Sequence, residues 1–445
     1  MGLPPAAAAF LTDVNPDDLW IPRNYKEAMT RSDLWAGPIQ IESDRLRARK
    51  VWHLVTRPEG ANIMKTMWVF DIKFDENGKL VKRKARLVAK GYTQIPGLDF
   101  FDTYASVVRY ESLRMTLAIA ASKGWKTWGI DFVSAYLNSK MKEQVYMAQP
   151  EGMDVEGSEG LICQLDFSLY GTMQGASNWW EELDRTYGDL GYRRSRADES
   201  VRVHLGEDGQ PTTITSTYTD DVTGISESDE EAEQAKRELG ERYDMTDLGK
   251  LNHVIGIKVD HNPDGSISIS QPAYCERLLK RYGMENVSLK RTPLSPNVSL
   301  TKSDFPLSHE DQDFMADKPY RSILGGLMFL MIATRPDLGF AVNILSSFAS
   351  NPGPAHWNEM VHCLGYVRNT MDYKITYYPG TDLKPVGYVD ADYGGFTDTM
   401  RSTSGELYTM AGGLVAWGAH REHVVALSTV ESEYMATAQQ MKWMS

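Results

Sequence analysis

The alternation of apolar and polar residues along the chain predicts both strands and helices. Residues 65–92 alternate on either side of Asn77-Gly78, a dipeptide that favours the tight turn of a β-hairpin. Residues 111–124 instead repeat apolar side chains every four positions and end on Gly124, which is typical of a helix with one apolar face. A short strand, WKTWGIDF, follows directly.

A second helix and a strand pair are predicted further along the chain. The helix spans residues 175–191. Its apolar face is expected to consist of Ala176, Trp180, Leu183 and Tyr187. The strand pair surrounds Asp220-Asp221, and the helix after it begins at Ser228, with Glu231 completing a capping box. This order of elements predicts an α+β fold, with helices on one side of a small antiparallel sheet.

Changes in composition divide the chain into four parts. Residues 1–45 begin with proline and alanine and are predicted to be weakly structured, apart from a short helix near NYKEAM. Residues 46–258 hold the strands and helices described above. Residues 259–380 contain a proline-rich linker, with TPLSP at 292–296, and then a long helical stretch. Residues 381–445 form a new strand-rich unit that begins around LKPVGYVDADYGG.

Composition indicates a globular chain able to bury sizeable cores, because 42% of its 445 residues are hydrophobic and 24% are charged. The sequence lacks an apolar run long enough to span a membrane, a secretory signal and a myristoylation pattern. Its three cysteines are too few and too scattered for a disulfide framework or a zinc finger. Cysteine use therefore favours a reducing compartment.

The net charge of −13 argues against nucleic-acid binding as a bulk property. One segment, KLVKRKARLVAK at 79–90, nevertheless concentrates positive charge and contains no acid. Its basic residues are Lys79, Lys82, Arg83, Lys84, Arg86 and Lys90. Such a segment could bind phosphate groups or form a solvated surface, and the pattern alone leaves both interpretations open.

Two adjacent acids, Asp220 and Asp221, interrupt TSTYTDDVTGIS, whose other residues suit a strand. Neighbouring carboxylates repel each other and lose hydration when partly buried. A bound divalent metal ion would offset both of these energetic costs. Asp131, at the end of its own strand, is the candidate third carboxylate. Because successive side chains of a strand point to opposite faces, we expect Asp131 and Asp220 to bridge two Mg²⁺ ions, with Asp221 at the margin. An ordinary Asp-Asp turn is the alternative.

Several motifs, in order, resemble the reverse transcriptases of copia-type retrotransposons. They extend from about residue 45 to residue 445 and include WVFDIKFDENGKLVKRKARLVAKGY, GIDFVSAYLNSKMKEQVYMAQPEG, SLYGTMQGASNWW, YTDDV and YRSILGGLMFLMIATRPDLGFAVN. The resemblance implies a right-hand polymerase, with fingers and palm over 46–258, thumb and connection over 259–380, and an incomplete ribonuclease H-like α/β unit over 381–445.

The same resemblance implies roles for individual residues. The catalytic and metal-binding acids would be Asp131, Asp220 and Asp221, with the backbone carbonyl of Phe132 as a further metal ligand. The residues around the incoming nucleotide would be Lys84, Arg86, Tyr136 and Gln174. The basic pair would hold the triphosphate, and the tyrosine ring would exclude nucleotides that carry a ribose 2′-hydroxyl.

GYVDADYGG and LSTVESEYMATA resemble the first strand and first helix of a ribonuclease H domain. By this resemblance Asp390 and Glu433 would be vestigial metal ligands, whereas Asp392 is expected in a turn. Glu433 is chosen over Glu431 as the second metal ligand, because Glu431 is expected to complete a capping box with Ser428. The two-metal site of that fold needs about four carboxylates. The sequence carries only the first part of such a domain, so ribonuclease H activity is predicted to be absent.

The resemblance implies RNA-directed DNA synthesis by a retrotransposon polyprotein whose cycle leads to DNA integration. Expected partners are an RNA template, a nucleic-acid primer, deoxynucleoside triphosphates and two Mg²⁺ ions, with Mn²⁺ as a substitute. No membrane partner is expected, and nothing in the sequence fixes an oligomeric state. The implied location is a cytoplasmic virus-like particle, with the nucleus as the alternative.

Two other interpretations stay open. One is an inactive transposon-derived fragment that retains the fold. It is favoured by GTMQGASNWW, which lacks a lysine and an arginine that the family usually carries beside the glutamine. The other is a non-catalytic nucleic-acid-binding protein.

Overall fold

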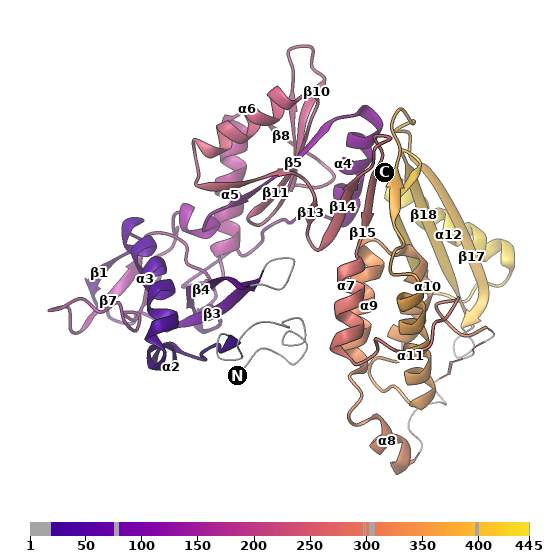
Figure 1. Cartoon of the computed structure of the whole chain (residues 1–445), viewed down its shortest axis with the longest axis horizontal. Coiled ribbons are helices and arrows are strands. Elements are labelled where there is room, and N and C mark those ends of the chain that lie inside the picture. The colour runs from indigo at the N-terminus through magenta and orange to yellow at the C-terminus, as the bar shows by residue number, and fades with distance from the viewer. Residues whose placement is uncertain are drawn as a thin grey trace.

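The computed structural model describes residues 19–74, 80–296, 298, 300–301, 308–396 and 400–444, and it is an α+β structure, as predicted. Its described strands form five sheets of two to six strands. Figure 1 shows the order of the units, from an indigo N-terminal unit through a central sheet to a group of helices and a yellow C-terminal sheet.

The first unit contains helices, a four-stranded sheet and a separate β-hairpin. Its helices are α2 (Tyr25–Thr30) and α3 (Ser32–Ala48). Its strands are β1 (Trp52–Thr56), β2 (Ile63–Met64), β3 (Thr66–Phe74), β4 (Leu80–Ala89), β6 (Tyr146–Met147) and β7 (Leu161–Leu165). Strands β3 and β4 pair in antiparallel fashion, which confirms the predicted strands, whereas the turn predicted at Asn77-Gly78 lies outside the described residues.

Helix α3 corrects the prediction of weak structure up to residue 45. Its sequence contains Gly37-Pro38, a pair that normally indicates a break, yet the helix continues through the proline. It does so because its apolar face is buried against the β3–β4 hairpin, from Trp35 to Leu46. Tertiary packing of an apolar face supplies most helix stability in proteins, and here it outweighs the local signal.

The second unit is a six-stranded antiparallel sheet with the strand order β12-β5-β11-β10-β9-β8. Its strands are β5 (Lys126–Phe132), β8 (Arg193–Arg194), β9 (Val201–Leu205), β10 (Pro211–Tyr218), β11 (Asp221–Ser226) and β12 (Met245–Lys250). Its helices are α4 (Tyr110–Lys123), α5 (Gly175–Asp189) and α6 (Asp229–Gly240). The predicted ends are confirmed at Gly124, which caps α4 with a φ of 69°, and at Ser228, which caps α6.

Helices cover both faces of this sheet, not one face as predicted. Helices α5 and α6 share a core with Val222, whereas α4 shares a different core with Ile225. These two residues point to opposite faces of β11, and both are buried. A strand that buries apolar side chains on both faces needs a covering layer on each side.

The third unit combines a small sheet with a helical bundle, and it confirms the predicted helical stretch. Its strands are β13 (His253–Val254), β14 (Ile257–His261), β15 (Ile267–Ser270) and β16 (Ile375–Tyr377). Its helices are α7 (Pro272–Arg281), α8 (His309–Met315), α9 (Tyr320–Ala333), α10 (Gly339–Ser346) and α11 (Pro354–Asn369). The boundary predicted after residue 258 falls inside β14.

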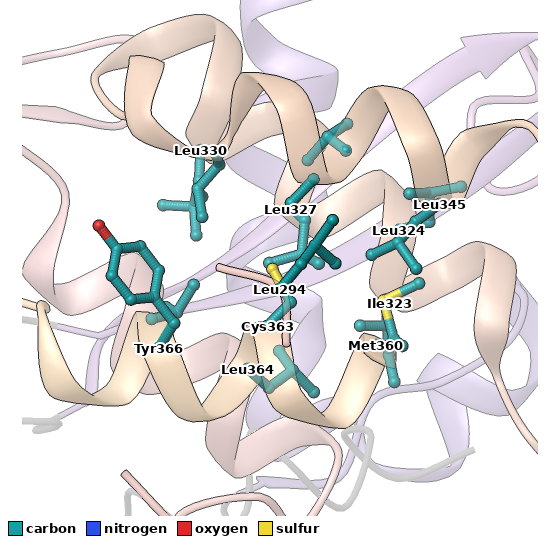
Figure 2. Close-up of a cluster of buried hydrophobic side chains, with 14 of the residues drawn as sticks. Leu294, Ile323, Leu324, Leu327, Leu330, Leu345, Met360, Cys363, Leu364 and Tyr366 are labelled. Carbon is teal, nitrogen blue, oxygen red and sulfur yellow. The ribbon is translucent and has the colours of Figure 1, made fainter. Parts of the chain in front are cut away.

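The segment 292–296 was predicted to be a linker, but it is bound to the bundle. Figure 2 shows Leu294 between the leucines of α9 and the side chains of α11, and only 9% of its surface is exposed. The hydroxyl of Ser295 donates to Glu359 at 2.7 Å. The proline-rich composition stops helix formation here, but it does not prevent packing.

The fourth unit is a three-stranded sheet with one helix. Its elements are β17 (Val386–Phe396), β18 (Arg401–Met410), β19 (Gly413–Arg421) and α12 (Thr429–Met444). The predicted first strand and helix are confirmed, but Asp392 lies within β17 opposite Thr403 and not in a turn. The three cysteines of the chain are buried and not in disulfides. Of the helices that the structure describes, none has the length and apolar character to cross a membrane.

Arg114 of α4 joins three units at one point. Its Nε donates to the carbonyl of Val415 in β19 at 2.7 Å, and its Nη1 donates to the carbonyl of Ala333 in α9 at 2.9 Å. The guanidinium also lies 3.8 Å from the ring centre of Trp417. The side chain is almost fully buried, at 1% exposure, so this contact is an internal part of the fold.

Candidate active site

The tip of the β10–β11 hairpin is a two-residue turn. Tyr218 pairs with Asp221, which leaves Thr219 and Asp220 to connect the strands. Thr219 has a φ of 58°, a left-handed conformation that residues other than glycine adopt at some energetic cost. The indole Nε1 of Trp179 donates to the Thr219 carbonyl at 2.8 Å and so stabilises this conformation.

Trp179 was missed as a site residue because the predicted apolar face of α5 included Trp180 in its place. Trp179 is 2% exposed, and its ring centre lies 5.4 Å from that of Phe132, beneath the hairpin tip. Leu183 and Tyr187 are buried, as predicted. The remaining residues of the predicted face, which are only half-buried, are Ala176 and Trp180. Two adjacent tryptophans leave the helical phase ambiguous, and only packing decides between them.

Pairing of β5 with β11 brings the three aspartates to one end of the sheet. Asp131 lies opposite Asp221 in the antiparallel register. The amide of Phe132 donates to the carbonyl of Asp220 at 2.9 Å, which joins the end of β5 to the turn. Residues far apart in sequence are thereby held together by backbone hydrogen bonds.

The carboxylates at this end of the sheet influence one another. Burial, and then the charges of Asp220 and Asp131, raise the pKa of Asp221 to about 6. Burial and then the charge of Asp220 also raise the pKa of Asp131, whereas the cations Lys84 and Arg86 lower it. Burial is thus the larger cause of both raised pKa values and repulsion between the acids the smaller one, and a bound cation would offset both.

A cavity of about 350 Å³ opens over these residues, between the first and second units. Its acidic floor is formed by Asp131 and Asp220. Its basic wall is formed by Lys82, Arg83, Lys84 and Arg86 of β4. Alternate residues of this strand, such as Leu87, are buried in the core of the first unit, so Lys84 and Arg86 face the other way. The guanidinium of Arg86 lies 5.2 Å from the ring centre of Tyr170, which also lines the cavity.

Two residues predicted near the nucleotide do not line this cavity. Gln174 is 1% exposed, and its amide is held by protein groups: it donates to the Asp99 carbonyl at 2.8 Å and accepts from Gln94 at 3.0 Å. The ring centre of Tyr136 lies 5.2 Å from that of Tyr170, which does line the cavity. The nucleotide-binding roles of Gln174 and Tyr136 therefore stay predictions.

The donor set at the cavity floor suits a hard divalent cation. Asp131 and Asp220 supply carboxylate oxygens to the cavity, and Phe132 also lines it. Asp221 does not line it, and among the described residues no three His, Cys, Asp or Glu side chains are arranged to hold a metal ion. Mg²⁺ is usually bound by one or two carboxylates, with water and substrate phosphates as its remaining ligands. Two carboxylates beside a basic wall fit that pattern.

The second predicted acid pair is not brought together in a cavity. Asp390 lines a separate cavity of about 600 Å³, between the fourth unit and the helices α9 and α10. Glu433 is exposed on α12 and does not line it. The amide of Glu431 donates to the Ser428 hydroxyl, as predicted, but the Glu431 carboxylate accepts from the amide of Leu427 and not from that of Ser428, so only half of the predicted capping box is present. The vestigial role of Asp390 and Glu433 stays a prediction.

Comparison with known proteins points to one family. A family model described as reverse transcriptase (RNA-dependent DNA polymerase) matches residues 49–296. Over 95% of its length the chain is 35% identical to a retrovirus-related Pol polyprotein from transposon TNT 1-94 of Nicotiana tabacum, of which it covers 32%. A retrovirus-related Pol polyprotein from transposon RE2 of Arabidopsis thaliana is 30% identical, again over 95% of this chain, and 28% of it is covered. The chain thus spans about a third of the length of these curated relatives.

Among solved structures, the chain is similar to the foamy viral protease-reverse transcriptase in complex with double-stranded DNA. The TM-score is 0.48 and the identity 12%, over 92% of this chain and 60% of that one.

Proposed function

The chain belongs to the reverse transcriptase family of copia-type transposons, and from this premise we propose that it extends a nucleic-acid primer with deoxynucleotides copied from an RNA template. The observation that supports this proposal best is the cavity with an acidic floor and a basic wall. In this assignment, the unit with α3 and β4 serves as fingers and the six-stranded sheet serves as palm.

The residues of the cavity would have different roles in phosphoryl transfer. Asp131 and Asp220 would hold two Mg²⁺ ions. Such ions, when bound, would activate the primer hydroxyl and neutralise the charge of the leaving group. Lys84 and Arg86 would bind the triphosphate and stabilise negative charge on the departing pyrophosphate. The turn at Thr219, whose carbonyl accepts from Trp179, would position Asp220 for catalysis.

Primer extension on an RNA template with Mg²⁺ tests the proposal. The wild-type chain is compared with Asp220→Asn, which preserves shape but removes the negative charge that a metal requires. Asp208→Asn is the matched control, because Asp208 lies before β10 at the opposite end of the hairpin and is exposed. We expect extension by the wild type and by Asp208→Asn, and its loss in Asp220→Asn.

Other outcomes of this experiment separate the remaining interpretations. Folded wild-type protein that neither extends nor binds primer–template would favour an inactive fragment. Salt-sensitive binding of primer–template without incorporation would favour a nucleic-acid-binding protein. Equal extension by all three proteins would contradict the role of Asp220.

Absence of ribonuclease H activity belongs to the same proposal. The substrate is an RNA–DNA hybrid with labelled RNA, incubated with Mg²⁺ and the same preparations. We expect no cleavage above that of a protein-free sample. Cleavage that disappears in Asp390→Asn would contradict this expectation.

A further inference from the structure

Helix α3 forms a third side of the cavity, and it precedes the segment 49–296 that matches the family model. The residues of α3 that line the cavity are Pro38, Ile41, Glu42 and Arg45. The C-cap residue Arg49 donates to Asn138, and to Asp244 at 2.8 Å, so the end of α3 is bound to the second unit.

Glu42 is an acid placed among the cations of the cavity. It is only 2% exposed, and its Oε2 accepts from Nη1 of Arg45 at 3.0 Å. Its other oxygen, Oε1, is buried and has no hydrogen-bond partner among the described residues. Burial raises the pKa of Glu42, whereas the charges of Arg45, Lys84 and Arg86 lower it. One carboxylate thus interacts with three cations, and a hydrogen bond from the backbone of Leu87 also lowers its pKa.

Arg45 has the chemistry and the freedom to bind a phosphate. Its side chain is 31% exposed, and Glu42 is the acid it pairs with. A guanidinium binds phosphate through a planar fork of donors, and an anion with several charges attracts it more strongly than one carboxylate does. A triphosphate that enters the cavity would meet Arg45 beside Lys84 and Arg86.

We propose that Glu42 and Arg45 form an anion-exchange pair in which Arg45 binds the triphosphate of the incoming nucleotide and Glu42 balances the basic wall while the cavity is empty. The identity of the ligand rests on the proposed function, whereas the exchange itself requires only a polyphosphate. Glu42 also makes the site selective, because an anion must compete with a built-in carboxylate to bind.

The same helix provides a matched control pair. Asp44 and Arg47 are three residues apart, like Glu42 and Arg45, and their charged atoms are 3.7 Å apart. Their side chains are 63% and 50% exposed, and they do not line the cavity. A change at Arg47 alters net charge and helix composition as a change at Arg45 does, but leaves the cavity intact.

Binding of inorganic triphosphate to the full chain, measured by isothermal titration calorimetry without primer or template, tests the proposal. We expect Arg45→Gln to weaken binding about tenfold, the loss typical of one charge-assisted hydrogen bond, and Arg47→Gln to leave it within about twofold. Glu42→Gln removes the competing anion and should tighten binding severalfold. Circular dichroism confirms that each variant is folded.

Three results would overturn the proposal: no binding by the wild type, equal binding by Arg45→Gln and Arg47→Gln, or unchanged or weaker binding by Glu42→Gln. This test is separate from that of the polymerase function. A wild type that extends primers while Arg45→Gln and Arg47→Gln bind triphosphate equally would leave the function standing and reject the pair. If Arg45→Gln alone lost triphosphate binding while the wild type did not extend primers, the anion-exchange pair would stand and the polymerase function would be rejected.

Discussion

At the scale of single residues, the geometry of the candidate site depends on side chains that carry no charge. Trp179 bonds to the carbonyl of Thr219, whose left-handed backbone turns the chain so that Asp220 lines the cavity. The aromatic rings of Phe132 and Tyr243 surround the same indole, with ring centres 5.4 and 5.2 Å away. The acids are placed by this apolar support, so changes below the cavity should affect chemistry within it.

Trp179→Phe should therefore destabilise the chain and slow primer extension. The substitution preserves most of the packing but removes the donor to the Thr219 carbonyl, which should lower the free energy of unfolding by about 1–2 kcal/mol. Urea denaturation measures this change. Trp180→Phe is the control, since the buried Nε1 of Trp180 has no partner among the described residues. Equal destabilisation by the two variants would contradict the role of the hydrogen bond.

The raised pKa of Asp221 predicts a pH dependence of stability in metal-free buffer. The pKa is about 6 in the folded chain, against an ordinary value of 3.8, so the folded state keeps this proton to higher pH than the unfolded state. Stability should therefore fall as pH rises from about 4 to 6, by the rule that links proton uptake to unfolding. Asp221→Asn should remove this loss and be more stable than the wild type at pH 7, by on the order of 1 kcal/mol after allowance for solvent screening.

Denaturation curves at pH 4 and pH 7, with and without Mg²⁺, check the expectation. Mg²⁺ should raise the stability of the wild type at pH 7 by binding the ionised acids. If the wild type lost no stability relative to Asp221→Asn between pH 4 and pH 7, the idea of mutual repulsion would be wrong.

At the scale of secondary structure, the elements that were predicted correctly from the sequence are those with strong local signals. The strand ending at Asp131 and the hairpin around Asp220 follow from alternation and from adjacent charges, and the structure confirms both elements. Helix α3 was not predicted, although Trp35 and Leu46 mark its apolar face, and it contains Gly37-Pro38, a pair that usually indicates a break. Local patterns show where a chain can form an element, whereas packing decides whether it does.

The cavity itself was beyond sequence analysis for a related reason. Its lining comes from α3, β4, β5 and the hairpin tip, and no short segment carries a signal for such a convergence. The composition of β4 shows only a basic cluster, and it was the family resemblance that assigned Lys84 and Arg86 to the nucleotide site; in the structure both line one cavity with Asp131 and Asp220. The contribution of Arg45 could not be foreseen without α3.

The docked segment 292–296 gives a prediction at this scale. Leu294→Ala should lower the free energy of unfolding by about 2–4 kcal/mol, because it removes a side chain buried between α9 and α11 and leaves a cavity. Leu289→Ala is the control, since 58% of Leu289 is exposed. Chemical denaturation measures both variants. If segment 292–296 were a free linker, the two substitutions would change the free energy of unfolding by small and equal amounts.

At the scale of the whole molecule, Arg114 connects units that are far apart in sequence. It binds the end of α9 and strand β19 from its place on α4, and so couples the central sheet to the C-terminal half. Two of its backbone acceptors, the carbonyls of Val415 and Ala333, belong to buried residues. Opening of the C-terminal sheet should therefore require this contact to break.

Arg114→Met should weaken the contact between α4, the end of α9 and strand β19. Loss of the guanidinium leaves buried carbonyls of α9 and β19 without their donor, so stability should fall by roughly 3 kcal/mol. Hydrogen–deuterium exchange should increase first in β19 and at the end of α9. Arg114→Lys should behave similarly, because an ammonium group cannot reproduce the planar fork. Lys123→Met, at an exposed position of the same helix, should change exchange little, and a comparable increase there would argue against this role of the contact.

The order of α3, β4, β5 and the hairpin along the chain has a consequence for biosynthesis. A ribosome makes the cationic strand β4 before either Asp131 or Asp220, so the growing polypeptide carries the basic wall of the cavity before its acidic floor. Nearby messenger RNA offers that strand an abundant polyanion. Glu42 of α3 emerges earlier still, so this acid of the cavity has already been made when β4 is synthesised.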